Sequence, residues 1–459
     1  YRKHAIFSLW DTFRAQHPLF TLLDPDRVDD LINSMLSFHD EYGLLPVWSL
    51  VGNETNTMTG HHALPVMADA YRKGYRGFDA EKALEAMVKS ARQDHRGLEH
   101  YKRHGYIPTE LEVESVTKTL EYAFDDWAIA SMAAELGHRE LAQEFRERAR
   151  SWRHLLDPET RFMRGKTAEG EWAEPFDPRR SDHREGTDYT EGNAWQHSWF
   201  VPHDVAGLMQ AMGGREAFLA KLDSLFTLDT IITGENVSAD ISGLMGQYAH
   251  GNEPSHHIAY LYNYAGQPWK TADRVWEILA TQYDDTPFGL SGNEDCGQMT
   301  AWYVLSALGF YPVNPAEATW VVGSPLFPEA IVELGGNRRL TIRAHGVSEE
   351  NRYVQSVRLK GRPHHRTFLR HSELAEGGLL EMEMGPEPSD WGTAPGAAPP
   401  SMSQPSPPEV APARGTASIR MNSISSGALP PDREMAEAVK AEFLHAWNNY
   451  LTYAEGDDM

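Results

Sequence analysis

Asp188–Asp204 reads Asp-Tyr-Thr-Glu-Gly-Asn-Ala-Trp-Gln-His-Ser-Trp-Phe-Val-Pro-His-Asp, which joins one carboxylate to a segment rich in aromatic side chains. That carboxylate, Glu191, stands beside a glycine and ahead of a predicted helix. A carboxyl group among tryptophans is partly desolvated, and desolvation raises its pKa because it disfavours the charged form. A general acid that works near neutral pH needs such a pKa. The alternative for this run alone is a packed helix with a buried, hydrogen-bonded glutamate.

A second polar stretch, Gly246–His257, gathers oxygen-bearing side chains around a glycine. Asn252 and Glu253 offer an amide and a carboxylate oxygen, and hard cations such as calcium prefer ligands of this kind. The two adjacent histidines that end the stretch could indicate zinc instead. Neighbouring side chains in a helix point roughly 100° apart, however, whereas zinc-binding helices space their histidines by four residues. A helix start, with Glu253 in its first turn, is the alternative to a metal site.

Three more acid-bearing loops lie between apolar segments. Glu294 and Asp295 stand between glycines, where paired carboxylates can start a helix or supply a general base that holds a water. Aromatic faces suit the C–H faces of a sugar, and polar groups suit its hydroxyls. The pair of acids used in glycoside hydrolysis fits this set of loops. The other two loops are Ser8–Arg14, with Trp10, Asp11 and Arg14, and Val51–Thr55, with Glu54.

Composition and motifs argue against several classes of protein. The formal net charge of −24 counts against binding to nucleic acid or anionic membranes, because both need cationic patches. No apolar run reaches about 18 residues, so no membrane span is predicted. Cys296 is the single cysteine, which excludes an intrachain disulfide and leaves the compartment open. Neither a Gly-x-Ser-x-Gly elbow nor a P-loop occurs, which counts against serine hydrolases and nucleotide-binding proteins.

The chain is expected to be mainly helical, with a small β region towards its C-terminal end. Residues 1–315 are expected to be helical, with no convincing strand ladder before about Leu308. In Val28–Leu36, for example, the apolar residues fall on one helical face after a proline in the first turn. Repeated helix pairs of this length favour a barrel of paired helices. Near-alternating apolar residues in 316–391 predict four strands, at 320–322, 330–334, 339–343 and 353–359.

The two ends of the chain differ from the body. Residues 392–431 are rich in Pro, Ala, Ser and Gly, a composition that predicts a disordered linker because it buries little apolar surface. A last helical pattern follows within 432–459 and is expected to form an isolated helix. The abrupt start at Tyr1 lacks a signal-peptide pattern, which leads us to expect a fragment whose upstream part is missing.

The acid-bearing loops, taken in order, resemble the signature segments of glycoside hydrolase family 92. The members of this family are calcium-dependent exo-acting α-mannosidases. The similarity runs from about residue 4 to 391. The resemblance implies an (α/α)6 helical barrel behind an N-terminal β-sandwich, and most of that sandwich is absent from this sequence. We therefore expect the missing sandwich to pack on the barrel. The matching segments are Ser8–Arg14, Gly52–Thr55, Tyr189–Asp204, Gly246–His257 and Gly292–Tyr303.

The resemblance also implies roles for individual residues. Glu191 matches the general acid and Asp295 the general base of an inverting mechanism, whose carboxyl groups are roughly 6.5–9.5 Å apart. Asn252 and Glu253 match the segment that holds Ca²⁺, which would bind the cis hydroxyls at O2 and O3 of mannose. The expected substrates are mannose-containing glycans or glycoproteins. The residues expected to contact the sugar are Trp10, Asp11, Arg14, Glu54, Trp195 and His256.

The C-terminal tail carries a second resemblance. Val439–Tyr450 and the residues after it are similar to the opening of glycoside hydrolase family 47, another family of calcium-dependent α-mannosidases, without its catalytic residues. The alternative to an active mannosidase is a non-catalytic remnant or a carbohydrate-binding protein. A secreted or secretory-pathway location is expected, with the cytoplasm as the alternative.

Overall fold

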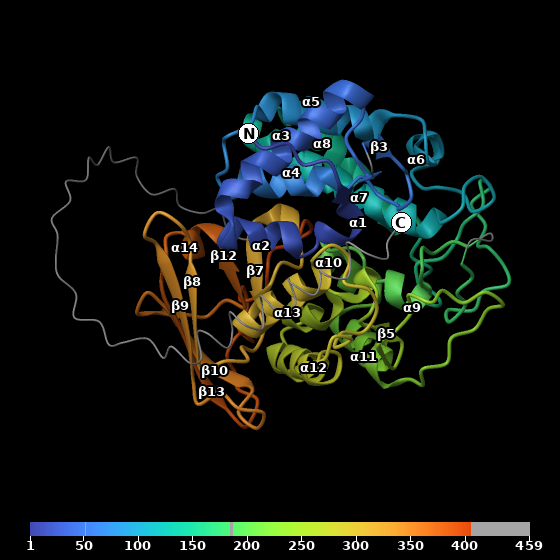
Figure 1. Ribbon diagram of the computed structural model, residues 1–459. Helices are drawn as coiled ribbons and strands as arrows, with labels where there is room; N and C mark the ends of the chain where they lie inside the picture. The colour runs from blue at the N-terminus through green and yellow to red at the C-terminus, as the bar shows by residue number, and fades with distance from the viewer. Residues whose placement is uncertain (51, 184–186, 405–459) are drawn as a thin grey trace. The chain divides into compact units, whose positions relative to one another are not determined.

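The computed structural model describes residues 1–50, 52–183 and 187–404. Residues 1–284 and 289–406 form one compact unit, and residues 285–288 belong to a second unit. The first unit is mainly helical, with strands gathered in its C-terminal part (Figure 1). Among the described residues, no helix combines the length and the apolar character needed to cross a membrane.

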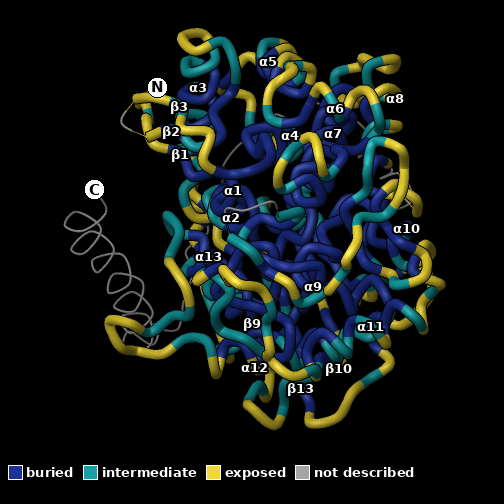
Figure 2. Tube along the Cα trace, turned by 90° about the vertical axis from the view of Figure 1, so that its right-hand side faces the viewer, coloured by how far each residue is buried: buried dark blue, intermediate teal, exposed yellow. Residues whose placement is uncertain are grey.

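The first half of the chain is built almost entirely of helices. Asp24 and Pro25 start α3 as predicted, and Gly43 ends it in the left-handed conformation (φ 96°) that favours glycine. α7 is a long enclosed helix, because nearly all of its residues are buried, charged ones included. Figure 2 shows it among other buried segments. The helices are α1 (Leu9–Thr12), α2 (Gln16–Leu23), α3 (Pro25–Tyr42), α4 (Ala63–Arg72), α5 (Ala80–Arg92), α6 (Leu98–His104), α7 (Ser115–Leu136) and α8 (Arg139–Arg148).

The second half has shorter helices and long loops. α9 spans one turn, Ala194–His197, and begins with a capping box formed by Asn193 and Gln196. The other helices are α10 (Val205–Ala211), α11 (Arg215–Thr227), α12 (Pro268–Thr281) and α13 (Gln298–Leu308), with short 3-10 turns η1 (Ser151–His154), η2 (Glu253–Ser255), η3 (Ile258–Asn263) and η4 (Pro315–Glu317).

Two short ladders correct the expectation that no strands precede residue 308. β1 (Phe7–Ser8), β2 (Trp48–Leu50) and β3 (Asn53–Glu54) form one antiparallel sheet. β4 (Leu244–Met245) and β5 (Tyr248–Ala249) form the other. Strands of two or three residues are too short to show the alternation that reveals a strand in a sequence. Both ladders lead into loops with acidic side chains.

The β region contains the four predicted strands and several others. β7 (Thr319–Val322), β8 (Glu329–Glu333), β9 (Arg339–His345) and β10 (Tyr353–Leu359) match the predicted runs closely. A five-stranded sheet has the order β11-β10-β13-β9-β8, with β13 and β9 parallel, and a three-stranded sheet has the order β12-β7-β6. The further elements are β6 (Phe310–Tyr311), β11 (Arg362–His364), β12 (Phe368–Arg370), α14 (His371–Ala375) and β13 (Gly378–Gly385).

The disordered linker predicted from residue 392 is wrong for residues 392–404. Ala397 and Met402 are buried, and the Met402 N–H donates to the His203 carbonyl at 2.8 Å. Ser401 Oγ and Ser403 Oγ donate to the Asp204 carboxylate at 3.1 and 2.8 Å. Composition misled the prediction because several small and proline residues of this segment are buried and hydrogen bonds to a buried carboxylate hold it in place. Residues 405–431 of the linker and the tail helix in 432–459 lie outside the described residues.

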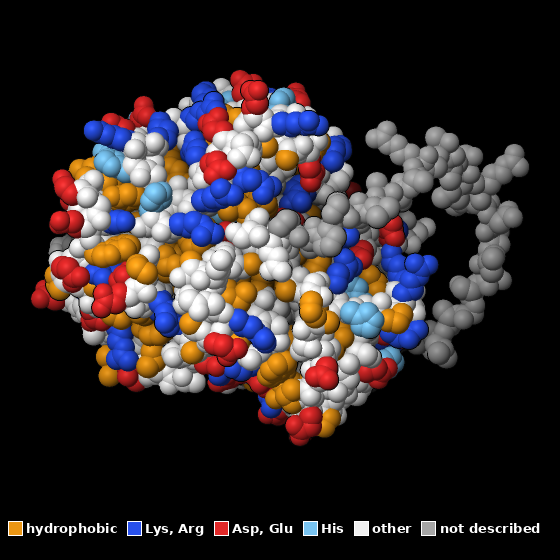
Figure 3. Space-filling model, turned by 180° about the vertical axis from the view of Figure 1, so that it is seen from behind, with side chains coloured by type: hydrophobic (Ala, Val, Ile, Leu, Met, Phe, Trp, Pro, Cys, Tyr) orange, Lys and Arg blue, Asp and Glu red, His pale blue; other side chains and the backbone are white. Residues whose placement is uncertain are grey.

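The surface of the unit mixes charges. Acidic, basic and hydrophobic side chains are interspersed over the face shown in Figure 3. Several opposite charges form exposed pairs, such as Arg92 with Glu144 and Arg339 with Glu333. Surface pairs of this kind contribute little stability, about 0–1 kcal/mol each.

Candidate active site

Three carboxylates from distant parts of the chain meet inside the molecule. One oxygen each of Asp11, Glu253 and Asp295 lies within 4.8 Å of the other two. Asp11 and Glu253 are buried, and Asp295 is partly exposed. Each comes from a different acid-bearing loop of the sequence. We call these three residues the acidic cluster.

Local structure explains how each acid reaches the cluster. Asp11 lies in α1, where the Ser8 hydroxyl donates to its carboxylate. Glu253 opens η2, and its backbone N–H donates to the side-chain oxygen of Asn252 at 2.9 Å. Asp295 has a positive φ of 52°, which few residues other than glycine adopt. The three carboxylates are thus set by a helix, a 3-10 turn and a tight loop.

The sequence left two roles open for the adjacent acids Glu294 and Asp295, a helix start and a general base. In the structure the two acids face different partners. Glu294 accepts hydrogen bonds from the N–H groups of Gly297 and Thr300 at the start of α13, so it serves the helix N-terminus. Asp295 turns the other way and joins the acidic cluster. The pair therefore holds the loop with one carboxylate and presents the other to the site.

Burial and mutual repulsion act on the acidic cluster. Burial raises the pKa of Asp11 to about 8, and the nearby charge of Asp295 adds to this. Burial, the charge of Asp11 and then Asp295 raise the pKa of Glu253 well above its usual range. Glu253 Oε1 is buried without a hydrogen-bond partner. Three carboxylates this close favour either protons or a cation, and oxygen donors of this kind suit a hard metal ion.

Glu191 lies close enough to the acidic cluster to be affected by its charge. Burial raises its pKa to about 8, with smaller contributions from Asp240, Asp11 and Asp295. The raised pKa predicted from the sequence is confirmed in direction and in main cause. The Asn252 side chain donates to the backbone carbonyl of Glu191 at 2.9 Å. This bond ties the loop of Glu191 to the loop that carries Glu253.

Trp10 and Arg14 flank Asp11. The Trp10 indole N–H donates to Glu121 at 2.7 Å, and the ring is buried. The Arg14 guanidinium lies 5.1 Å from the Trp10 ring centre and 5.2 Å from that of Phe200. Arg14 Nη2 is buried and has no hydrogen-bond partner, and burial lowers the pKa of this arginine. A buried cation with an unused donor, beside buried acids, is typical of a site that binds a polar ligand.

The other three residues predicted to contact a sugar stand outside the acidic cluster. Trp195 packs edge-on to Phe162, with 4.7 Å between ring centres, and under Lys221. The Glu54 carboxylate accepts the backbone N–H groups of residues 47, 48 and 56, so it shapes its own loop. His256 has both ring nitrogens engaged, with the His250 carbonyl and the Gln298 amide at 3.0 Å each. Their contacts with substrate stay predictions.

Several buried polar residues near the site escaped the sequence analysis. Glu121 and Asp125 lie in α7, and His62 lies between them, 3.7 Å from Glu121 and 3.2 Å from Asp125. Asp240 affects Glu191 from a long loop. A signal for the first two was present, because acids within the apolar stripe of a long helix need a partner when buried. Nothing in the sequence distinguished Asp240 from its exposed neighbours.

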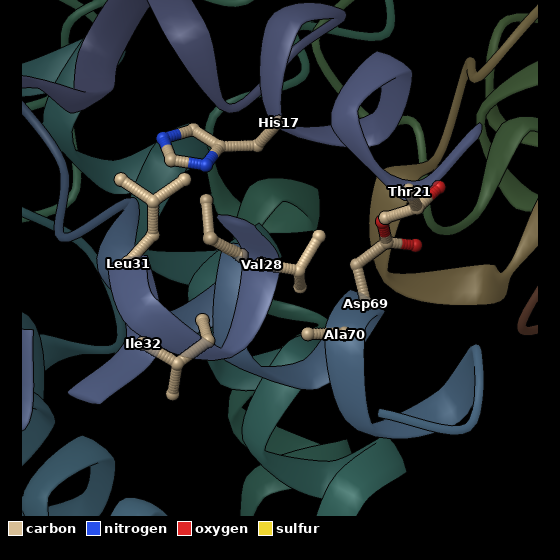
Figure 4. Close-up of a pocket in the computed structure, with 8 residues that line it drawn as sticks. His17, Thr21, Val28, Leu31, Ile32, Asp69 and Ala70 are labelled. Atoms are coloured by element: carbon tan, nitrogen blue, oxygen red, sulfur yellow. The ribbon is translucent and has the colours of Figure 1, made fainter. Parts of the chain in front are cut away.

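A separate small cavity lies between α2, α3 and α4 (Figure 4). His17, Leu31 and Val28 line one part of it, and Thr21 and Asp69 another. None of the predicted site residues lines this cavity. Asp69 pairs at 2.7 Å with Lys73, the residue that follows α4, so its charge is compensated locally. The cavity is a packing feature of the helices and is distinct from the acidic cluster.

Comparisons with known proteins identify a family and several similar structures. The profile described as the glycosyl hydrolase family 92 catalytic domain matches residues 1–386. A family 92 α-mannosidase from Bacteroides thetaiotaomicron, solved in complex with mannoimidazole, is similar with a TM-score of 0.83 and 40% identity, over 87% of this chain and 53% of its own. A family 92 inverting mannosidase from the same organism is similar with a TM-score of 0.78 and 37% identity, over 86% of this chain and 55% of its own.

A curated fungal protein is also similar. It is an uncharacterized secreted glycosidase from Arthroderma benhamiae, 28% identical over 432 residues, which are 85% of this chain and 53% of that protein. The chain thus spans about half the length of the relatives it matches. Because the family profile covers most of the sequence, the family suggested by the acid-bearing loops is confirmed. The profile of the family's catalytic domain matches the greater part of the sequence, and this chain therefore belongs to glycosyl hydrolase family 92.

Proposed function

We propose that the chain releases terminal α-linked mannose from glycans, with inversion at the anomeric carbon. Membership of family 92 and the likeness to α-mannosidases support the substrate class. The observation that carries the proposal is the meeting of Asp11, Glu253 and Asp295, with Glu191 within their electrostatic reach. Hydrolysis with inversion needs one carboxyl group to donate a proton and another to activate a water.

Glu191 is the proposed general acid. With a pKa of about 8, its carboxyl group keeps its proton at neutral pH and can pass it to the departing glycosidic oxygen. Asp295 is the proposed general base, since it is the most exposed member of the acidic cluster and a water can reach it. The water gives a proton to Asp295 and attacks the anomeric carbon from the opposite face. The glycosidic bond breaks as its oxygen receives the proton of Glu191.

Calcium is the proposed metal. Glu253 and Asn252 are the proposed ligands, and Asp11 adds a third oxygen. The fit rests on Glu253 Oε1, which is buried without a partner, and on Asn252 Oδ1, which accepts one N–H and keeps a second lone pair. A calcium ion held there would bind the cis hydroxyls at C2 and C3 of mannose.

The remaining predicted residues are assigned to the sugar pocket and its walls. Trp10 and Arg14 would contact the terminal mannose through a ring face and a cation with an unused donor. For Glu54, Trp195 and His256 we propose an indirect role, because each holds a loop or packs under it.

We also propose that the helices of residues 1–315 close into the (α/α)6 barrel expected from the family. Packing of α4 and α5 against α7 supports paired helices in that part of the chain. An N-terminal β-sandwich, as expected in longer relatives, would pack on this barrel. The activity of the whole protein, its substrates and its partners are proposals, because the chain covers about half of those relatives.

Proton NMR of the sugar released from a simple α-mannoside tests the proposal, because it separates the two anomers. We expect β-mannose to appear first and α-mannose only later, by mutarotation. Initial release of α-mannose would contradict inversion. Binding of the mannoside without any release would instead indicate a carbohydrate-binding protein.

A further inference from the structure

Glu121 is a buried carboxylate that the proposed chemistry does not use. It lies in the middle of α7 and is 2% exposed. One of its oxygens accepts the Trp10 indole N–H at 2.7 Å, although the two residues are 111 positions apart. A bond of this kind fixes the rotation of the indole ring, because the ring has a single N–H donor.

A compensating charge keeps Glu121 ionised in its buried position. His62 Nε2 lies 3.7 Å from the second carboxylate oxygen, and His62 Nδ1 lies 3.2 Å from Asp125. The His62 ring stacks on Phe13 with 4.1 Å between ring centres and an angle of 13°. His62 lowers the pKa of Glu121 against the opposing effect of burial. A buried ionic group of this kind is a weak stabiliser at best, so a role in fixing neighbouring groups is the better explanation for it.

A second branch leads from Glu121 to the loop of the proposed acid. The Thr59 hydroxyl lies near enough to Glu121 to help lower the pKa of that carboxyl group. Thr190 Oγ1 lies 3.4 Å from Thr59 Oγ1, and the Thr190 N–H donates to Thr117 at 3.0 Å. Thr190 immediately precedes Glu191 in the chain. Glu121 therefore has a direct hydrogen bond to Trp10 and lies near Thr59, which bonds to the loop of Glu191.

We propose that Glu121 is a positioning residue, which orients the Trp10 indole and steadies the loop of Glu191 on the two sides of the sugar pocket. This inference rests on the proposed mannosidase function and assigns the site a residue that does not touch the sugar itself. It acts through Trp10 first, because that hydrogen bond is direct. Its influence on the acid loop passes through Thr59, which accepts the Thr190 hydroxyl at 3.4 Å.

A double-mutant cycle on α-mannoside hydrolysis tests the direct branch. Glu121→Met removes the acceptor and Trp10→Phe removes the donor. Each is expected to lower kcat/KM by about tenfold, which is the lower end of what the loss of a hydrogen bond to a charged group causes. The double variant should fall by about the same tenfold, because both changes remove one interaction. Losses that multiply to about a hundredfold would overturn the proposal.

Two further variants separate positioning from stability. Glu121→Gln keeps an acceptor for the indole N–H and should recover most of the activity lost in Glu121→Met. Asp126→Asn is the matched control, since Asp126 is also a buried acid of α7 but bonds to Tyr101 and Arg148. It should lower the melting temperature and leave kcat/KM unchanged. A loss of kcat/KM in Asp126→Asn equal to that in Glu121→Met would contradict a specific role for Glu121.

An NMR measurement without substrate distinguishes this inference from the proposed function. In protein labelled with ¹⁵N at the indole, the Trp10 signal is the one missing in Trp10→Phe. We expect Glu121→Met, which removes the acceptor, to shift that signal and Asp126→Asn to leave it in place. An unmoved signal in Glu121→Met would overturn the inference even in an active enzyme. If the signal shifts but the protein hydrolyses no mannoside, the proposed function is contradicted, whereas the Trp10–Glu121 hydrogen bond is supported.

Discussion

Glu191 and Asp295 share a backbone conformation that residues with side chains seldom adopt. Their φ angles are 50° and 52°, in the left-handed region. Such a conformation costs about 1–3 kcal/mol and persists where the surrounding structure imposes it, often at active sites. Asn252, which bonds to the Glu191 carbonyl, and Glu294, which holds the loop of Asp295, impose it here. Two strained residues of the right chemistry thus lie in one site.

The role of Glu191 leads to a prediction at this scale. Glu191→Gln should lower turnover of mannosides with poor leaving groups by about a hundred- to ten-thousand-fold, the range that general acid catalysis contributes. Aryl mannosides with good leaving groups need little protonation and serve as the control. Parallel rates on both substrates are the measurement. Equal losses on both would contradict the assignment of the acid.

The pH profile gives a second prediction. Glu191 acts in its protonated form, and a raised pKa extends that form up to a pH of about 8. Activity should therefore fall as the pH rises through that value. The Asp240 charge helps to raise the pKa, so Asp240→Asn should move this alkaline limb to lower pH. Profiles of kcat/KM for the two proteins test it. A limb that stays in place would show that another group controls it.

At the scale of elements, the sequence predicted what its periodicity could reveal. The apolar stripe of α3 and the four main strands follow from spacings that repeat over several residues. The ladders of β1–β3 and β4–β5 were missed because two or three residues show no repeat. Residues 392–404 were missed because their packing depends on hydrogen bonds to Asp204, a partner nearly two hundred residues away.

That docked segment gives a stability prediction. Ser401 Oγ donates to Asp204 at 3.1 Å and accepts the Ala206 N–H at 3.0 Å. Ser401→Ala should lower the free energy of unfolding by about 1–2 kcal/mol, as expected for lost hydrogen bonds to a buried acid. Ser348→Ala is the control, because Ser348 bonds only in an exposed loop. Urea unfolding of both variants is the measurement. Equal stabilities would mean that the segment is undocked in solution.

At the scale of the whole molecule, the site is made by residues from four separate segments. The sequence identified Asp11, Glu191, Glu253 and Asp295 one by one, from their neighbours. It could not tell which acids meet, because that depends on how the helices pack. It also assigned Glu54 and His256 to the sugar, which stays a prediction; in the structure Glu54 accepts backbone N–H groups, and His256 bonds to the His250 carbonyl and the Gln298 amide. Glu121 and His62 became visible only in the folded chain.

The acidic cluster makes a prediction about calcium that concerns the molecule as a whole. Calorimetric titration of chelator-treated protein should show one calcium ion bound per chain, with mannose release returning in proportion to occupancy. Glu253→Gln should abolish both, since it neutralises a buried ligand. Full activity in the chelated protein, with no calcium bound, would contradict the account of this site.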